Sequence, residues 1–211
     1  MKAQNLLRSV VLAGAAVGGT ANAVIVFSDD FESTVPPVFL PAGSFLAASG
    51  SGTPIGNFGN GWTLTGGIDL IREAFLGAHT FGAINNVSVD LSGSPGPGKL
   101  EHAFDFVAGL TYTLNFDYFR NAPGTNLTVQ FAGFTFGLPA ASISGVEHET
   151  LSWTPTSSGT GTFSFAGDSG FFGPTIDNIV LTAVPEPGPT ALLLSGLCVV
   201  GFLARRRMHS S

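Results

Sequence analysis

Few residues of this 211-residue chain have the types and spacing that metal binding or catalysis requires. Glu147, His148 and Glu149 follow one another, and carboxylates and imidazole are side chains that bind metal ions. On a strand, however, Glu147 and Glu149 share one face and His148 takes the other, so the three side chains do not converge on one ion. We therefore interpret this segment as a solvent-exposed edge strand.

A second candidate is the glycine-rich run from Gly93 to Lys99, which has the glycine and lysine spacing of a phosphate-binding loop. Leu100 replaces the required Ser or Thr, and a strand pattern follows where a helix should begin. We interpret the run as a hairpin-type turn. Paired carboxylates for glycoside hydrolysis are recognised only by their separation in space. With 10% charged residues and no catalytic motif, a secreted hydrolase is the least favoured function.

Two adjacent aromatic residues, Phe171 and Phe172, form a third candidate within a glycine-rich run. Adjacent side chains on a strand point to opposite faces, so at most one ring belongs to the core there. The other ring is a candidate platform for stacking a sugar. The alternative is that both rings are buried under the segment from Ser33 to Gly61, which is rich in Pro, Gly, Ser and Ala and which we expect to be a long loop.

The elements that must position these residues are strands. Apolar and polar residues alternate over 100–106 and 112–118, which is the pattern of half-buried strands, and residues 107–110 between them predict a hairpin. Turn residues recur about every ten positions, which favours an all-β antiparallel sandwich, most consistent with a jelly roll. The other predicted strands are 24–27, 62–64, 68–71, 87–91, 127–131, 150–153, 162–165 and 176–182.

Both ends of the chain carry export features. Lys2 and Arg8 form a charged region before an apolar run at residues 10–17, and Ala21-Asn22-Ala23 forms a peptidase cleavage site, so residues 1–23 are a predicted signal peptide. Residues 24–183 are then the predicted ectodomain. The ectodomain is expected to end before the Pro-Glu-Pro of residues 185–187, because proline continues neither a helix nor an inner strand.

The C-terminal segment, residues 184–211, has three parts. It begins with a short motif, continues with an uncharged run over 188–204 and ends in a basic cluster. The motif is Val184, Pro185, Glu186 and Pro187, and the basic cluster is Arg205, Arg206 and Arg207. As a helix the 17-residue run would be about 26 Å long, at the short limit for crossing a bilayer. The arginines then place the C-terminus in the cytoplasm. The ectodomain is expected on the opposite side of the membrane.

These three parts together resemble the PEP-CTERM sorting signal of Gram-negative bacteria. The resemblance implies recognition by a membrane processing enzyme, an exosortase, which cuts near the Pro-Glu-Pro and passes the protein to the envelope or the exterior. It implies a route of export and leaves the activity open.

Charge and cysteine content narrow the functional class of the body. Residues 24–186 contain three basic and all fourteen acidic residues, a formal net charge of −11, which repels nucleic acid and anionic lipid and excludes nucleic-acid binding. The single cysteine, Cys198, lies in the predicted terminal helix, so the body is held by packing without disulfides.

Five short stretches of the body resemble the galactose-binding-type jelly rolls that commonly precede such tails: 30–32, 67–71, 89–93, 111–117 and 176–181. In jelly rolls of this type, acidic residues after the first strand and at the start of the last strand converge on a structural calcium. The resemblance therefore implies a calcium site at Glu32, with Asp30 as its neighbour, and at Asp177.

The sequence predicts an exported, non-catalytic module that binds polysaccharide. The alternative is a purely structural or adhesive protein of the cell surface, matrix or biofilm, without a small-ligand site. An exposed aromatic platform would separate the two, and the candidates are Trp62, Trp153, Phe171 and Phe172.

Overall fold

The computed structural model describes eight segments of the body: 22–32, 45–53, 60–72, 86–93, 96–120, 125–138, 145–168 and 173–185. For 45–53 and for residue 120, it describes the backbone alone. The chain divides into two units, of which Asn22–Glu186 carries every described strand, and Met1–Ala21 with Pro187–Ser211 forms the other. In the tail, Gly196–Cys198, Val200 and Arg205 are described, and they are helical.

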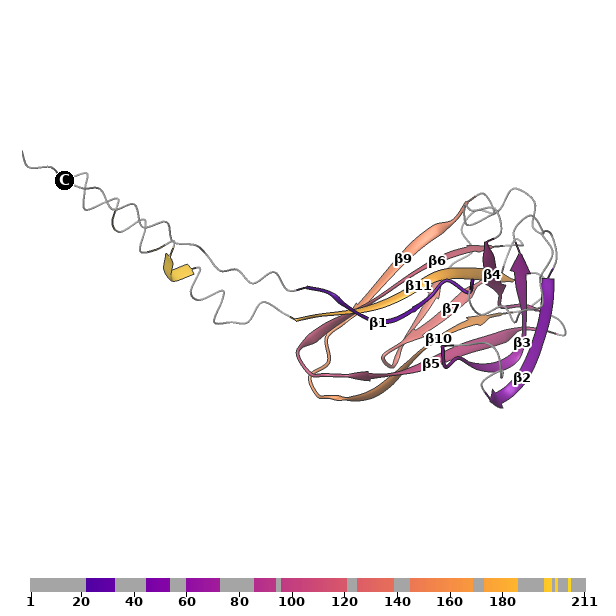
Figure 1. Ribbon diagram of the computed structural model, residues 1–211, viewed down its shortest axis with the longest axis horizontal. Helices are drawn as coiled ribbons and strands as arrows, with labels where there is room; N and C mark the ends of the chain where they lie inside the picture. The colour runs from indigo at the N-terminus through magenta and orange to yellow at the C-terminus, as the bar shows by residue number, and fades with distance from the viewer. Residues whose placement is uncertain are drawn as a thin grey trace, which may run out of the picture. The chain divides into compact units, whose positions relative to one another are not determined.

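The described part of the body contains eleven strands, all paired antiparallel (Figure 1). They are β1 (Val24–Asp29), β2 (Phe45–Thr53), β3 (Thr63–Arg72), β4 (Val87–Asp90), β5 (Gly98–Phe106), β6 (Leu110–Arg120), β7 (Leu127–Phe131), β8 (Phe134–Leu138), β9 (Glu147–Trp153), β10 (Gly159–Gly167) and β11 (Pro174–Pro185). The predicted all-β antiparallel class is confirmed.

The strands follow one hydrogen-bonded path, β8-β7-β10-β5-β3-β4-β11-β6-β9, with β1 on β11 and β2 on β3. The path folds over on itself, because rings from its two halves meet across the core. Phe116 of β6 packs edge-on against Phe165 of β10, with ring centroids 4.9 Å apart. Trp153 of β9 packs against Phe106 of β5 at 4.7 Å. The result is a curled, two-layered sandwich of the predicted jelly-roll kind.

Strand β3 carries the hydrogen bonding from one layer to the other. Its first residues, Thr63 to Gly66, pair with β5, and its last residues, Asp69 to Arg72, pair with β4. Gly66 lies at the change of partner in the left-handed region, with φ 81°. A Cβ there would lie 2.3 Å from the carbonyl oxygen of Pro97, so only glycine fits.

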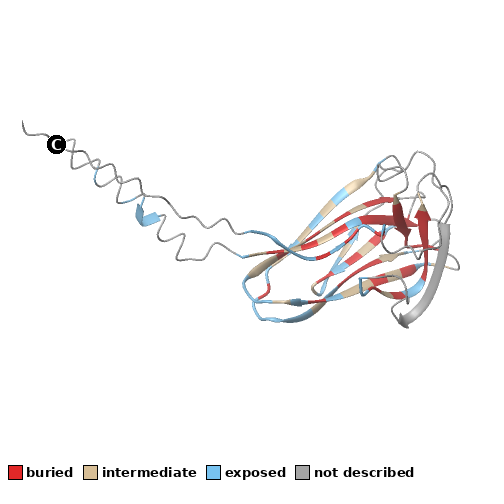
Figure 2. Ribbon diagram, viewed as in Figure 1, coloured by how far each residue is buried: buried red, intermediate tan, exposed pale blue. Residues whose placement is uncertain are grey.

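The strands of the body carry most of the buried residues (Figure 2), and an aromatic cluster forms much of the core. Trp62 is 1% exposed and contacts Phe27 at 5.2 Å and Phe163 at 5.5 Å between ring centroids. Trp62 is therefore a core residue and no binding platform. Each buried aromatic ring of this size removes a large apolar area from water, which is the main stabilising contribution in a body without disulfides.

The predicted hairpin between residues 100–106 and 112–118 is wrong. Strands β5 and β6 do not pair with each other, since β5 pairs with β10 and β3, and β6 pairs with β11 and β9. Both strands have one apolar face, and those faces meet across the core, where Phe104 and Tyr112 lie 5.7 Å apart. Residues 107–110 thus connect the two layers.

Two further expectations are corrected. The segment from Ser33 to Gly61, expected to be a loop, contains β2, which pairs along β3; small residues without apolar alternation gave no strand pattern. The Gly93 to Lys99 run connects β4 to β5, which both pair with β3 and not with each other, so it is no hairpin turn. A strand does follow it, as expected.

Candidate functional site

The predicted acidic residues lie at the end of the sandwich where β1 finishes and β11 begins. Asp30 and Glu32 follow β1, and Asp177 lies inside β11. The pairing of β11 with β6 shifts register between Asp177 and Val180, and Asn178 at this bulge has φ 50°. On its other edge, β11 changes partner here from β4 to β1. At this bulge the Asp177 side chain bonds to Asn86, just before β4, whereas the Asn178 side chain bonds to Asp117 on β6.

Asp177 is fully buried and held by two hydrogen bonds. The Asn86 side-chain Nδ2 donates to its Oδ2 at 2.7 Å, and the Asn178 backbone N–H donates to its Oδ1 at 2.7 Å. The pKa of Asp177 is raised to about 7, chiefly because the carboxyl is buried. The two hydrogen bonds act in the opposite direction and lower this pKa, whereas the nearby carboxylates of Glu32 and Asp117 raise it further. A fully buried carboxyl with two donors is still poorly compensated as an anion.

Glu32 lies close enough to Asp177 for the two carboxylates to influence each other. Its Oε1 accepts a hydrogen bond from the Val87 backbone N–H at 2.6 Å, next to the Asn86 that holds Asp177. Burial raises the pKa of Glu32, and Asp30 raises it further, against the Val87 hydrogen bond and Arg72. The structure thus brings Glu32 and Asp177 together at the start of β4.

Asp30 is exposed beside this pair, and its Oδ1 accepts the Glu32 N–H at 3.2 Å. Within the described residues, no three His, Cys, Asp or Glu side chains are arranged to hold a metal ion. A calcium ion takes six to eight oxygens. At this site it would therefore draw on Glu32, Asp177 and backbone carbonyl groups.

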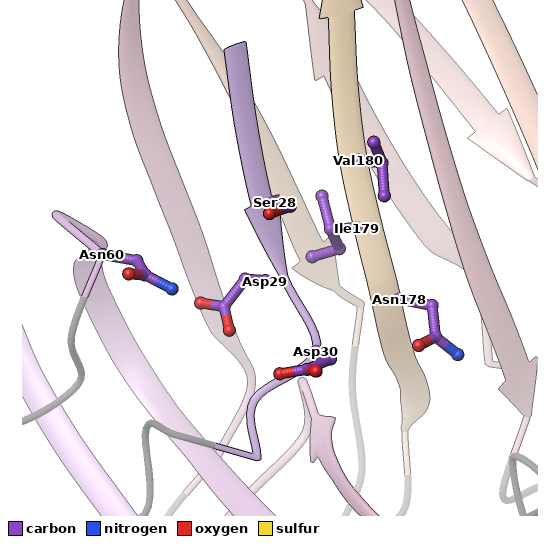
Figure 3. Close-up of a pocket in the computed structure, with 7 residues that line it drawn as sticks. All are labelled: Ser28, Asp29, Asp30, Asn60, Asn178, Ile179 and Val180. Atoms are coloured by element: carbon purple, nitrogen blue, oxygen red, sulfur yellow. The ribbon is translucent and has the colours of Figure 1, made fainter. Parts of the chain in front are cut away.

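An open cleft of about 500 Å³ lies beside the acidic pair (Figure 3). Its walls come from β1, from the turn before β3 and from the β11 bulge. The lining residues are Ser28, Asp29, Asp30, Asn60, Asn178, Ile179 and Val180. The cleft is thus polar on most sides and apolar along the β11 wall.

Asp29 gives the cleft a rigid floor. It is 4% exposed, and its carboxylate accepts hydrogen bonds from Trp62 Nε1 at 2.7 Å and from the Phe31 N–H at 2.8 Å. Phe31 is itself buried, with φ 56°. The end of β1 is therefore fastened to the aromatic core.

Asn60 and Asn178 are exposed on two sides of the cleft, and both have left-handed backbones, with φ 48° and 50°. Asparagine tolerates this conformation better than most residues. With Phe31, these are three of the four non-glycine residues of positive φ in the described chain. Such positions concentrate at functional sites, where the surrounding structure holds them.

The Asn178 carboxamide is fixed from the side facing β6. Its Nδ2 donates to Asp117 Oδ2 at 2.9 Å, and the other oxygen of Asp117 contacts His148 Nδ1. His148 is exposed on β9, at one end of the strand path, and Glu147 on the other face accepts from Tyr118 Oη at 2.5 Å. The edge-strand interpretation of this segment agrees with the structure.

Sequence reasoning missed Asn60 and Asn178, which line the cleft, and Asn86, which bonds to Asp177. The signals in the sequence were the Asn-Gly pair at 60–61 and the Asp-Asn pair at 177–178, both of which favour turns or bulges. They do not show that the two segments meet.

The structure places the other predicted site residues at the two ends of the body and in the tail. Ala23 is exposed immediately before β1, and Val184 and Pro185 end β11, paired with Thr111 and Leu110. Arg205 is exposed and helical. Outside the described residues lie Ala21, Phe171, Phe172, Glu186, Pro187, Arg206 and Arg207. No helix in the described part of the chain has the length and apolar character needed to cross a membrane.

The C-terminal segment matches a known protein family. Residues 183–207 match the PEP-CTERM protein-sorting motif, as predicted. The motif implies export, sorting to the cell envelope and processing by an exosortase. No curated protein matches the chain in a comparison of sequences.

Three solved structures illustrate what the fold is similar to. TmCBM61, in complex with beta-1,4-galactotriose, is 16% identical with a TM-score of 0.42, covering 57% of this chain and 86% of that one. The K3 adhesin domain of Lys-gingipain from Porphyromonas gingivalis is 14% identical with a TM-score of 0.41, covering 75% and 99%. The CBM6cm-2 carbohydrate-binding module of Cellvibrio mixtus lichenase 5A is 16% identical with a TM-score of 0.33, covering 48% and 81%. The jelly-roll assignment therefore rests on strand pairing and core packing.

Proposed function

We propose that this is an exported, exosortase-processed protein of the cell surface or extracellular matrix whose β-sandwich binds polysaccharide without catalysis. Before processing, its C-terminal segment is anchored in the inner membrane with the C-terminus in the cytoplasm. The observation that carries the binding function is the open cleft bounded by Asp30, Asn60 and Asn178.

The chemistry of the cleft suits sugar hydroxyl groups. Asp30 supplies a carboxylate, Asn60 and Asn178 supply carboxamides, and Ser28 supplies a hydroxyl, which together offer donors and acceptors. Val180, which is partly exposed, offers an apolar contact for the carbon face of a ring. The volume of about 500 Å³ falls within the ordinary range of ligand sites.

The cleft is also held in shape before any ligand arrives. Asp29 is fastened to Trp62, and Asn178 is fastened to Asp117. A preformed site loses less conformational freedom on binding, which favours affinity for a flexible polymer.

We further propose a structural calcium at Glu32 and Asp177. A divalent cation there would supply the positive charge that two neighbouring carboxylates of raised pKa lack. It would fix the segment after β1 to the β11 bulge, both of which line the cleft. Phe171 and Phe172 remain the proposed aromatic contact, three and two positions in sequence before the first residue of β11.

The second candidate is a structural or adhesive protein with no small-ligand site. It is favoured by the burial of Trp62, which removes one predicted platform. A secreted hydrolase stays the least favoured alternative.

A glycan array with calcium and with chelator tests the binding function. Asn60→Gly and Asn178→Gly keep the left-handed backbone and remove the carboxamides, so both should lose glycan retention while remaining folded. Ala132→Gly is the matched control, because Ala132 has φ 53° in the turn between β7 and β8, away from the cleft. Glycan retention unchanged in both asparagine variants would contradict the site, and an array without any hit would favour the structural alternative.

A further inference from the structure

The two ends of the body lie side by side. Val24 at the start of β1 pairs with Ala183, and Pro185 at the end of β11 pairs with Leu110 (Figure 1). The Gly109 N–H donates to the Pro155 carbonyl at 3.0 Å, which brings the turn after β9 to the same place. We name this region the exit pole and define it as residues 22–26, 105–111, 152–160 and 182–185.

The exit pole is almost free of charge although the body carries a formal −11. Among these described residues, Asp105 is the single charged side chain, and it accepts a hydrogen bond from Thr160 Oγ1 at 2.8 Å. Asp30, Glu32 and Asp177 lie at the far end of β1 and β11. The negative charge of the body, which the sequence predicts to repel anionic lipid, is therefore concentrated away from the exit pole.

The exit pole also exposes most of the large apolar side chains that are exposed on the described body. Val24 is 62% exposed, Ile25 63%, Val26 38% and Val107 54%, and the remaining one is Phe134. The pairing of β1 shifts register between Ile25 and Phe27, so the ordinary alternation is interrupted and three successive apolar residues face outward.

We infer that the exit pole lies against the phospholipid surface of the membrane that holds the C-terminal segment. The chain leaves this pole after Pro185 toward the apolar segment at residues 188–204, so lipid is the first surface that we expect the pole to meet. Apart from Asp105, the described residues of the pole have no charged side chain to desolvate there, and they expose valines and isoleucine. This inference rests on the membrane anchoring in the proposed function.

The orientation has a consequence for the cleft. Strand β1 runs from Val24 in the exit pole to Asp29 in the cleft, so these two residues lie five strand steps, or about 17 Å, apart. With the pole on lipid, the end of β1 that lines the cleft would be held away from the membrane surface. The competing occupant of the exposed β1 edge is a second copy of the chain.

Fluorescence quenching on the full chain tests the inference. In a Cys198→Ala background, Ile25→Cys and Val107→Cys report on the exit pole, and Asp168→Cys reports on the opposite end of β10. Each variant carries a nitrobenzoxadiazole label and is reconstituted in phosphatidylethanolamine and phosphatidylglycerol vesicles with headgroup-nitroxide lipid. We expect strong quenching at positions 25 and 107 and little at 168.

The outcomes separate the inference from the proposed function. Weak quenching at all three positions in a chain that resists carbonate extraction overturns the inference and leaves the anchoring intact. Extraction by carbonate overturns the anchoring and the inference with it. Label-to-label quenching without nitroxide lipid, lost on dilution with unlabelled chain, identifies a second copy as the occupant and also overturns the inference. Val107→Ser, labelled at position 25, should quench less than its parent.

Discussion

Replacing Asp177 with asparagine should change stability in opposite directions with and without calcium. Asp177 is fully buried, and its pKa rises from 3.8 to about 7 in the folded body. A raised folded pKa means that the protonated carboxyl stabilises the fold below about pH 4, and that this advantage is lost as pH rises through about 7.

The size of the effect follows from the shift. A difference of about three pKa units corresponds to about 4 kcal/mol at most, shared in part with the neighbouring Glu32. The carboxamide introduced by Asp177→Asn would carry no charge, but its NH₂ group would face the Asn86 donor and lose about 1 kcal/mol of hydrogen bonding. In chelator at pH 8, the variant should therefore be more stable than the natural chain by about 2–3 kcal/mol.

Calcium reverses the comparison. A cation that binds only the folded state adds about 2.7 kcal/mol at a hundredfold excess over its dissociation constant, and the natural chain alone should gain it. Urea titration of both chains at pH 5 and pH 8, with calcium and with chelator, measures the free energy of unfolding under each condition. The gap in chelator should shrink at pH 5, where the natural carboxyl is protonated. Asp177→Asn that is less stable in chelator at pH 8, or that responds to calcium like the natural chain, would refute the reasoning.

Three further predictions concern the core, the layer change and processing. Phe163→Ala, at a fully buried ring, should lower the free energy of unfolding by about 3–5 kcal/mol in a denaturant titration, and a loss below about 1 kcal/mol would contradict the core assignment. Gly66→Ala should destabilise far more than Gly109→Ala, because both have positive φ but only the Cβ at Gly66 meets backbone, and equal melting temperatures would contradict this. Mass spectrometry of the exported protein should find Val24 as its first residue, and where an exosortase is active it should find no Arg205, Arg206 or Arg207; a mature form starting at Met1 would disprove export.

The strands were predictable from the sequence wherever one face of the strand is buried and the other is exposed to solvent. The alternation over residues 100–106 and 112–118 gave β5 and β6, because period two records which face meets the core. The partners were not predictable, since apolar faces fit equally a hairpin and two facing layers. Here Phe104 and Tyr112 meet across the core, and pairing goes to β10 and β11.

The residues of the candidate site were likewise predictable only in part. Glu32 and Asp177 came from a resemblance in strand order, and the structure brings them together beside Asn86. Asn60 and Asn178 were not found, because their importance comes from a left-handed backbone and from a register shift between strands. Strand β2 was missed because residues 45–53 are mostly small, and their pairing depends on the edge that β3 offers.

The pairing of β1 with β11 sets an order of events for export. Val24 and Ala183 are partners, and β11 lies between β6 on one side and β4 and β1 on the other, so the sheet is incomplete until nearly the whole body has crossed the membrane. Contacts between residues so far apart in sequence form slowly, because the loop must close first. The sorting motif starts at residue 183 and so overlaps the end of β11, the last described strand in chain order. A body that has not yet folded leaves Val184 and Pro185 unpaired, whereas a folded body holds them against β6, and the processing enzyme therefore meets two physically different substrates.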